Sequence, residues 1–341
     1  MHWAKSSAPH CQSLPTPDQQ IVTEPVELTA VTNASVYFPG SKQVVMATDG
    51  TVVSRRGVDN THLAEIPWQT HQHLAGTSLL LGDSAGARNY YHWTLDVLPK
   101  LGYLERAEFD LDSIDHFLVR DAKTPFQLES LMKLGIDESR IIETASQPHL
   151  SCDKALLLPL KHRVNMSMHP FAPAWVNSMF GDTDNAHNST DDTTKLYLKR
   201  PPGGRRGITN EDELEALLVQ RGFETVVMTG LSIAQQAHLL AKADIVISPH
   251  GGTLTNIVYA KPGTKIIELF GSHVYPYYFG LANLCNHEYH ALLQNPQDYA
   301  KLVQVKAAMN NGNAANQSIT QFEEFSVDMN ALDQAISACL S

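Results

Sequence analysis

Residues 244–256 read DIVISPHGGTLTN, and this stretch decides how the second half of the chain is interpreted. The apolar residues 245–247 predict a buried strand, and residues 253–259 predict a short helix. The two glycines between them let the backbone approach a ligand closely, and the free N–H groups that open a helix favour an anion. A tight turn without a ligand is the alternative. A strand, a glycine turn and a helix in this order are typical of α/β sheets that bind nucleotide phosphates at their carboxyl edge.

The alternation of strands and helices continues on both sides of this stretch. Strands are predicted at 195–199, 224–228, 244–248 and 265–270, with helices at 210–220 and 232–243. Asn210 and Glu213 fit a capping-box start for the first helix, and Ser232 fits the cap of the second. Four strands with helical crossovers predict a Rossmann-like half.

The N-terminal half predicts a second α/β unit. Short β-rich runs fill residues 21–53, and after residue 77 strands and helices alternate. The strands are expected at 79–81, 116–120 and 155–158, and the helices at 90–104 and 125–134. Pro99 lies inside the first of these helices and predicts that it kinks or ends there. The fold class is therefore α/β, with two similar halves.

The domain boundaries follow from changes in composition. Residues 181–194 contain almost no apolar side chain and predict an exposed linker. The expected parts are a first domain over 1–180 with an irregular arm at 1–20, the linker, a Rossmann-like domain over 195–275 and a helical tail over 276–341.

The composition excludes several classes of partner. The chain has 341 residues, and 36 acidic against 25 basic side chains give a net charge of −11. This balance disfavours nucleic acid or an anionic membrane as the main partner. The four cysteines include no C-x-x-C pair, which favours a reducing compartment. No secretory leader is recognisable, and no apolar run reaches the roughly 18 residues of a transmembrane segment, so we expect a cytoplasmic protein.

Basic and acidic residues follow the predicted strands at the same edge as His250. Arg200, Arg205 and Arg206 come directly after strand 195–199, and guanidinium groups bind phosphate in a bidentate way. A solvated basic loop is the alternative for these arginines. Glu268 ends strand 265–270, where a carboxylate can take ribose hydroxyls or simply face solvent.

His92 and Asp96 lie four residues apart in YYHWTLDVLPKL and share a helix face. Such a pair can position or accept a proton, although a packed histidine and a capping aspartate would give the same pattern. The histidine pairs 71/73 and 287/290 have no third ligand nearby, and we interpret them as structural or surface residues rather than as a metal site.

The stretch GDSAG at 82–86 has the G-x-S-x-G pattern of a nucleophile elbow, with Ser84 as the nucleophile of a serine hydrolase. In hydrolases that also use an HGG motif, that motif precedes the serine in sequence. Here HGG follows at 250–252, so the hydrolase is kept only as an alternative. No G-x-G-x-x-G follows a predicted strand, which disfavours a nicotinamide dehydrogenase.

Three stretches together resemble glycosyltransferase family 61. They are NYYHWTLDVLPKL at 89–101, RGITNE at 206–211, and HGGTLTN at 250–256 with IE at 267–268. Their order and spacing also agree, and weaker likeness extends the resemblance over roughly residues 77–340. The family includes extracellular O-GlcNAc transferases, plant xylan transferases and bacterial proteins of capsular polysaccharide synthesis. Departures are Gly252 for the usual alanine, Thr253 for glycine and Lys100 for arginine.

The resemblance implies the GT-B architecture, in which two Rossmann-like domains face a cleft. It also implies an inverting transfer from a nucleotide sugar, most simply a UDP-sugar, to a glycan, lipid-linked or protein hydroxyl, with no metal or other cofactor required. In that scheme Asp96 is the base, with His92 beside it, on the acceptor-side domain. Glu268 would hold the ribose, and the donor phosphates would contact Arg200, Arg206, His250, Gly251, Gly252, Thr253 and Asn256. A nucleotide-binding domain without catalysis is a further alternative.

Overall fold

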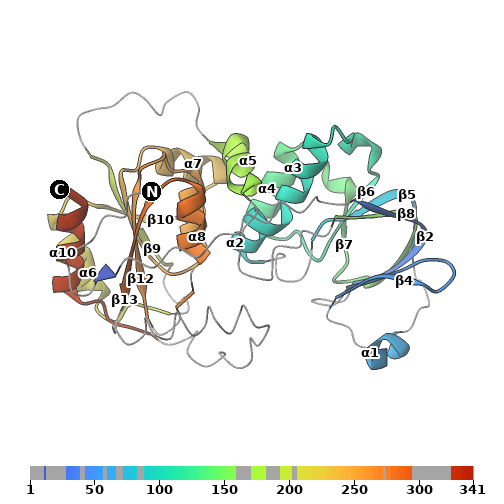
Figure 1. Cartoon of the computed structure of the whole chain (residues 1–341), viewed down its shortest axis with the longest axis horizontal. Coiled ribbons are helices and arrows are strands. Elements are labelled where there is room, and N and C mark those ends of the chain that lie inside the picture. The colour runs from blue at the N-terminus through green and yellow to red at the C-terminus, as the bar shows by residue number, and fades with distance from the viewer. Residues whose placement is uncertain are drawn as a thin grey trace. The chain divides into compact units, whose positions relative to one another are not determined.

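The computed structural model describes residues 11–12, 28–38, 43–56, 60–66, 72–82, 88–158, 170–181, 193–201, 206–271, 274–275, 277–293 and 324–340. Contacts group the chain into two compact units. We call Thr23–Lys161 the N-terminal unit, and Met1–Val22 together with His162–Ser341 the C-terminal unit. Each unit has its own sheet with helices, so the expected α/β class is confirmed (Figure 1).

The N-terminal unit is built on one mixed sheet. Its described strands are β2 (Thr29–Tyr37), β3 (Gln43–Met46), β4 (Val52–Arg56), β5 (Gln72–Leu80), β6 (His116–Val119), β7 (Ile141–Glu143) and β8 (His149–Leu157). They are ordered β4-β3-β2-β8-β5-β6-β7. The strands from β8 to β7 are parallel, as the alternation after residue 77 predicts, and the β-rich start adds antiparallel strands beside β8. Apolar side chains of β2, β3, β5, β6 and β8 form a buried cluster in this unit.

The predicted helix over 90–104 is present, but its middle is a π-helix. The described helices of this unit are α1 (Asn60–Glu65), α2 (Tyr90–His92), the π-helix η1 (Trp93–Val97), α3 (Pro99–Arg106), η2 (Leu111–Ser113), α4 (Pro125–Lys133) and η3 (Glu138–Arg140). Pro99 has no N–H, and in an α-helix its ring would meet the carbonyl four residues earlier. The wider turn avoids this clash, and the Leu98 N–H donates to the Trp93 carbonyl at 2.9 Å, five residues back.

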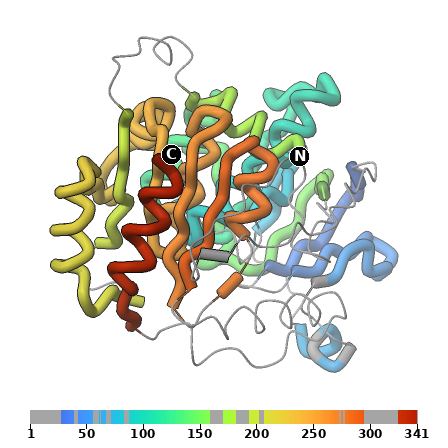
Figure 2. The backbone as a smooth tube through the Cα atoms, turned by 60° about the vertical axis from the view of Figure 1, so that its left-hand side comes forward, coloured from blue at the N-terminus to red at the C-terminus, as the bar shows by residue number. Residues whose placement is uncertain are grey.

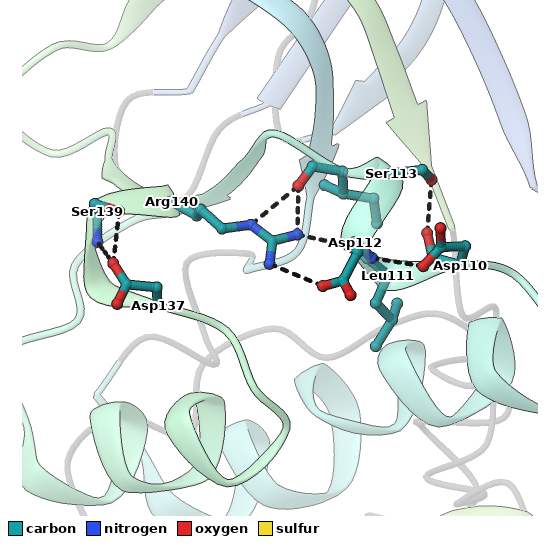
Figure 3. Close-up of polar contacts among 8 residues, drawn as sticks. Asp110, Leu111, Asp112, Ser113, Asp137, Ser139 and Arg140 are labelled. Carbon is teal, nitrogen blue, oxygen red and sulfur yellow. Dashed lines mark hydrogen bonds and ion pairs between the residues drawn. The ribbon is translucent and has the colours of Figure 1, made fainter.

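Arg140 joins the two short helices that precede β6 and the edge strand β7 (Figure 3). Its guanidinium donates to the carbonyl oxygens of Leu111 and Ile114, each at 2.6 Å, and forms an ion pair with Asp112 at 3.4 Å. One side chain therefore satisfies carbonyl groups of η2 and the residue after it, and fixes the loop before β6.

The C-terminal unit is a doubly wound sheet with one extra edge strand. Its described strands are β1 (Cys11–Gln12), β9 (Lys195–Lys199), β10 (Glu224–Val227), β11 (Ile245–Pro249), β12 (Lys265–Phe270) and β13 (Glu288–Leu293). The sheet order is β1-β13-β12-β11-β9-β10, parallel except for β1. Counted from β9, the five parallel strands have the order 2-1-3-4-5. The four predicted strands are confirmed, and β13 is a fifth.

Helices cover both faces of this sheet. They are α5 (Phe171–Phe180), α6 (Glu211–Gln220), α7 (Ile233–Ala241), the 3₁₀-helix η4 (Gly252–Tyr259), α8 (Tyr277–Leu284) and α10 (Met329–Leu340). On one face α6 packs beside α10, and on the other α7 and α8 contact η4 (Figures 1 and 2). The predicted tail over 276–341 is therefore not purely helical, because β13 completes the sheet and α10 covers its core.

The contact units also differ from the predicted domain ranges. The break falls at residues 161/162, whereas the first domain was expected to run to 180. The reason is that α5 packs against η4 and α7, which both belong to the C-terminal unit. Most of the predicted linker, residues 182–192, lies outside the described residues, as do the predicted arm apart from residues 11–12 and residues 294–323 of the predicted tail.

Candidate active site

The carboxyl edge of the C-terminal sheet has a topological switch point between β9 and β11. From β9 the chain turns to β10 on one side, and from β11 it turns to β12 on the other. Ligands of open α/β sheets bind in the crevice outside such a point. Arg200 directly follows β9 and His250 directly follows β11, so two of the predicted phosphate ligands flank the switch point. The Ser248 hydroxyl donates to the Leu198 carbonyl at 3.3 Å and ties the two strand ends together.

His250 is held on several sides. Its ring stacks on Phe270 with centroids 5.2 Å apart, and Tyr278 of α8 meets it edge-on at 5.4 Å. Its Nδ1 lies 2.5 Å from Oε1 of Glu268, and its carbonyl accepts a hydrogen bond from Arg200. Burial lowers the pKa of His250 well below its ordinary value, and Arg206 and Arg200 lower it further. The ring is therefore a fixed group in a positive environment.

Glu268, the predicted ribose ligand, lies inside the sheet of the C-terminal unit. Its side chain is 0% exposed, because β12 lies between β11 and β13 inside the sheet. One carboxylate oxygen contacts His250, and the other accepts a hydrogen bond from the Tyr289 hydroxyl of β13. Burial raises the pKa of Glu268 well above its ordinary value, although Tyr289, Arg206 and Arg200 act in the opposite direction. Glu268 therefore supports His250 in this structure, and its contact with a ribose stays a prediction.

Gly251 and Gly252 open η4, as the glycine turn predicts. A Cβ atom on Gly251 would lie 2.8 Å from Nη2 of Arg200, so a larger residue there would displace the guanidinium. Asn256 is fully buried, and its amide donates to Gln236 at 2.8 Å and to the Thr253 carbonyl at 3.1 Å. These bonds hold the turn that opens η4, and a contact between Asn256 and the donor stays a prediction.

Arg206 is placed by a segment from the far end of the chain. Its φ of +62° lies in the left-handed region, which costs free energy for a residue other than glycine. The following residues are clamped by residues 325–327: Phe325 donates to the Gly207 carbonyl at 3.1 Å, and Val327 exchanges two 2.9 Å hydrogen bonds with the Asn210 side chain. The Asn210 side chain therefore does not cap α6, contrary to the predicted capping box. Arg205 lies outside the described residues.

The predicted pair His92 and Asp96 is present in the N-terminal unit. Nδ1 of His92 lies 2.6 Å from Oδ2 of Asp96, and both side chains are partly exposed, at 26% and 16%. Asn89 caps the start of α2 by accepting from the Tyr91 and His92 N–H groups. One turn later, Lys100 donates to the Leu81 carbonyl at 2.8 Å. The pair can therefore present a carboxylate of fixed orientation at the surface of this unit.

The remaining histidines have structural contacts. His73 lies between Ser151 and Asp153, His287 contacts the Ile257 carbonyl, and His290 pairs with Glu288. His71 and Ser84 of the GDSAG stretch lie outside the described residues.

Two contributions to the site were not found in the sequence. Tyr289 holds Glu268, and the segment around Phe325 holds the loop of Arg206. Tyrosine on a strand and an isolated phenylalanine are ordinary core residues, so these residue types do not indicate a functional site. Tyr277 and Tyr278 of α8 also lie beside His250, with ring centroids 6.5 Å and 5.4 Å from that of the histidine.

A family comparison covers both the His92–Asp96 pair and the His250 edge. The model for Glycosyltransferase 61 matches residues 90–267, which is more than half of the chain. The chain belongs to glycosyltransferase family 61. It is accordingly a glycosyltransferase, and the match includes every predicted site residue except Glu268, which follows the last matched residue directly. No curated protein matches the chain.

Family membership favours the transferase over the hydrolase alternative, since the matched region begins after Ser84. It implies a sugar donor and an acceptor as partners. Among the helices in the described part of the chain, none is both long and apolar enough to cross a bilayer.

Proposed function

We propose that this glycosyltransferase inverts the anomeric centre while it moves a sugar from a nucleotide sugar, most simply a UDP-sugar, to a hydroxyl of a glycan or other acceptor. The observation that carries the proposal is the gathering of Arg200, Arg206 and His250 with the start of η4 at the sheet's switch point. The GT-B arrangement implied by the family resemblance belongs to this proposal, as does a role in polysaccharide synthesis.

The positive groups at the carboxyl edge of the C-terminal sheet suit the leaving diphosphate, which is negatively charged. Burial and Arg206 lower the pKa of Arg200 to about 10, so its guanidinium stays charged at neutral pH. Two fixed cations and the N–H groups at the start of η4 stabilise the charge that develops as the sugar–phosphate bond breaks. In the proposal these groups make a metal ion unnecessary for the departure.

The attacking hydroxyl needs a base. Asp96 takes its proton while the acceptor oxygen forms a bond to the anomeric carbon and the bond to the diphosphate breaks with its electron pair. His92, 2.6 Å away, orients the carboxylate. A single displacement of this kind inverts the configuration.

The experiment is a calorimetric titration of UDP into the protein with EDTA present. We expect micromolar binding that His250→Ala and Arg206→Ala each abolish. A wild-type protein that does not bind UDP would remove UDP-sugars as donors. Binding by either variant with wild-type affinity would show that the phosphate assignment is wrong.

A further inference from the structure

Glu268 and His250 form a buried pair whose carboxyl half the proposed reaction does not use. The Glu268 side chain is 0% exposed and the His250 side chain 8% exposed, and Nδ1 lies 2.5 Å from Oε1. A carboxyl group without exposure, directed at a histidine that flanks the switch point, needs a reason. Burying a pair of ionisable groups carries a desolvation penalty. We therefore expect Glu268 to have a role in the state of His250.

The pair can hold either one or two protons. One proton always lies between Nδ1 and Oε1, whichever atom carries it. With only that proton, Nε2 on the other side of the ring carries a lone pair and repels a phosphate oxygen. With a second proton, Nε2 carries a hydrogen and is a donor. This is true whether the pair consists of an imidazolium and a carboxylate or of a neutral imidazole and a carboxylic acid.

We propose that Glu268 positions His250 and keeps this second proton available, so that binding of a nucleoside diphosphate takes up a proton on Nε2 of His250. The inference rests on the proposed function, since it deepens the role of the same phosphate site. The glutamate is a positioning residue, and the histidine is the group that contacts the diphosphate.

The charges around the pair make the uptake depend on the ligand. Arg200 after β9 and Arg206 both face the pair and disfavour a further positive charge in the free protein. The Tyr289 hydroxyl stabilises the carboxylate form of Glu268 from β13. From α8, Tyr277 and Tyr278 contribute ring contacts, and burial keeps the hydroxyl of Tyr278 protonated. A bound diphosphate adds negative charge beside the pair and so favours the form with two protons.

The sign of the pH dependence follows. The binding form has two protons, so affinity is full below the pKa of the pair in the free protein. Above that pKa the affinity falls by up to about tenfold per pH unit, until the pKa of the bound pair is reached.

The test is a calorimetric titration of UDP between pH 7 and pH 9.5 in buffers of small and large ionisation enthalpy. Above about pH 7.5 the terminal phosphate of UDP is fully ionised and does not itself take up protons, because its pKa is about 6. We expect uptake approaching one proton per UDP and a dissociation constant that rises with pH.

Glu268→Gln is the decisive variant. Its carboxamide accepts from Tyr289 and donates to Nδ1, which fixes a neutral ring with a permanent Nε2–H. We expect UDP binding without proton uptake and with a dissociation constant that is independent of pH over this range. Tyr289→Phe is the matched variant: it removes a donor to the carboxylate, raises the proton affinity of the pair, and shifts the onset of the decline to higher pH.

The outcomes separate the two claims. Binding of UDP by the wild type without proton uptake overturns this inference and leaves the proposed function intact. Uptake that persists unchanged in Glu268→Gln also overturns it. If Glu268→Gln does not fold, a Tyr289→Phe profile identical to that of the wild type overturns it. If the wild type binds no UDP in any buffer, the proposed donor fails and this inference fails with it.

Discussion

Replacing Gly251 with alanine tests whether the position of Arg200 determines nucleotide binding. The new Cβ would lie 2.8 Å from Nη2 and 3.3 Å from Cζ of Arg200. Ordinary contacts need about 3.5–4.0 Å, so the guanidinium must move by about 1 Å. The backbone of Gly251, with φ 165°, is extended and accepts alanine, so the clash with Arg200 is the main cost.

The size of the effect follows from the contacts that move. Arg200 donates to the His250 carbonyl, and in the proposed function it also contacts the diphosphate. A hydrogen bond of a charged group contributes about 1.5–3 kcal/mol. Loss of one such contact to UDP weakens binding by about 10- to 150-fold. Loss of the bond to the carbonyl lowers the melting temperature by about 3–12 °C for a unit of this size.

The assay is UDP titration by calorimetry together with thermal unfolding. Gly280→Ala is the matched control, because a Cβ there meets nothing within 4 Å and alanine favours the helix α8. We expect wild-type affinity and an equal or higher melting temperature for the control. If Gly251→Ala binds UDP within about twofold of the wild type and unfolds at the same temperature, Arg200 does not act as described.

Three further predictions concern catalysis and stability. Asp96→Asn is expected to keep the UDP affinity and to lower the rate of sugar transfer by about 10²- to 10⁴-fold, because that is the contribution of a general base. Full activity in a donor-turnover assay would show that Asp96 is not the base. Arg140→Ala removes the guanidinium donor from the carbonyls of Leu111 and Ile114, of which Leu111 keeps the bond from the Ile114 N–H, and destabilises the N-terminal unit by about 2–3 kcal/mol. Arg140→Lys recovers part of this, and urea denaturation with equal midpoints for all three proteins would contradict it. Asn210→Ala removes both hydrogen bonds to Val327, destabilises the C-terminal unit by about 2 kcal/mol and weakens UDP binding through Arg206. Asn210→Asp keeps the bond from the Val327 N–H and is expected to lie between the wild type and the alanine variant, and unchanged UDP affinity in Asn210→Ala would show that the clamp does not position Arg206.

Local patterns determined the elements and the edge at which the candidate site lies. The apolar run before His250 and the glycines after it are contiguous in sequence, so the strand, the turn and the start of η4 could be predicted from short-range rules. The same holds for His92 and Asp96, because a separation of four residues on a helix brings two side chains together without help from the rest of the fold.

The tertiary structure decided the roles of Glu268, Asn256 and Arg206. Whether a strand-end carboxylate faces a ligand or the core depends on the strands beside it, and β13, which was not predicted, buries Glu268 and adds Tyr289. Asn256 is satisfied by Gln236 of a neighbouring helix, and Gly207 and Asn210, which follow Arg206, are held by residues more than a hundred positions away. Such long-range contacts leave no periodic signal in the sequence, because they depend on how distant elements pack and not on local conformational preference.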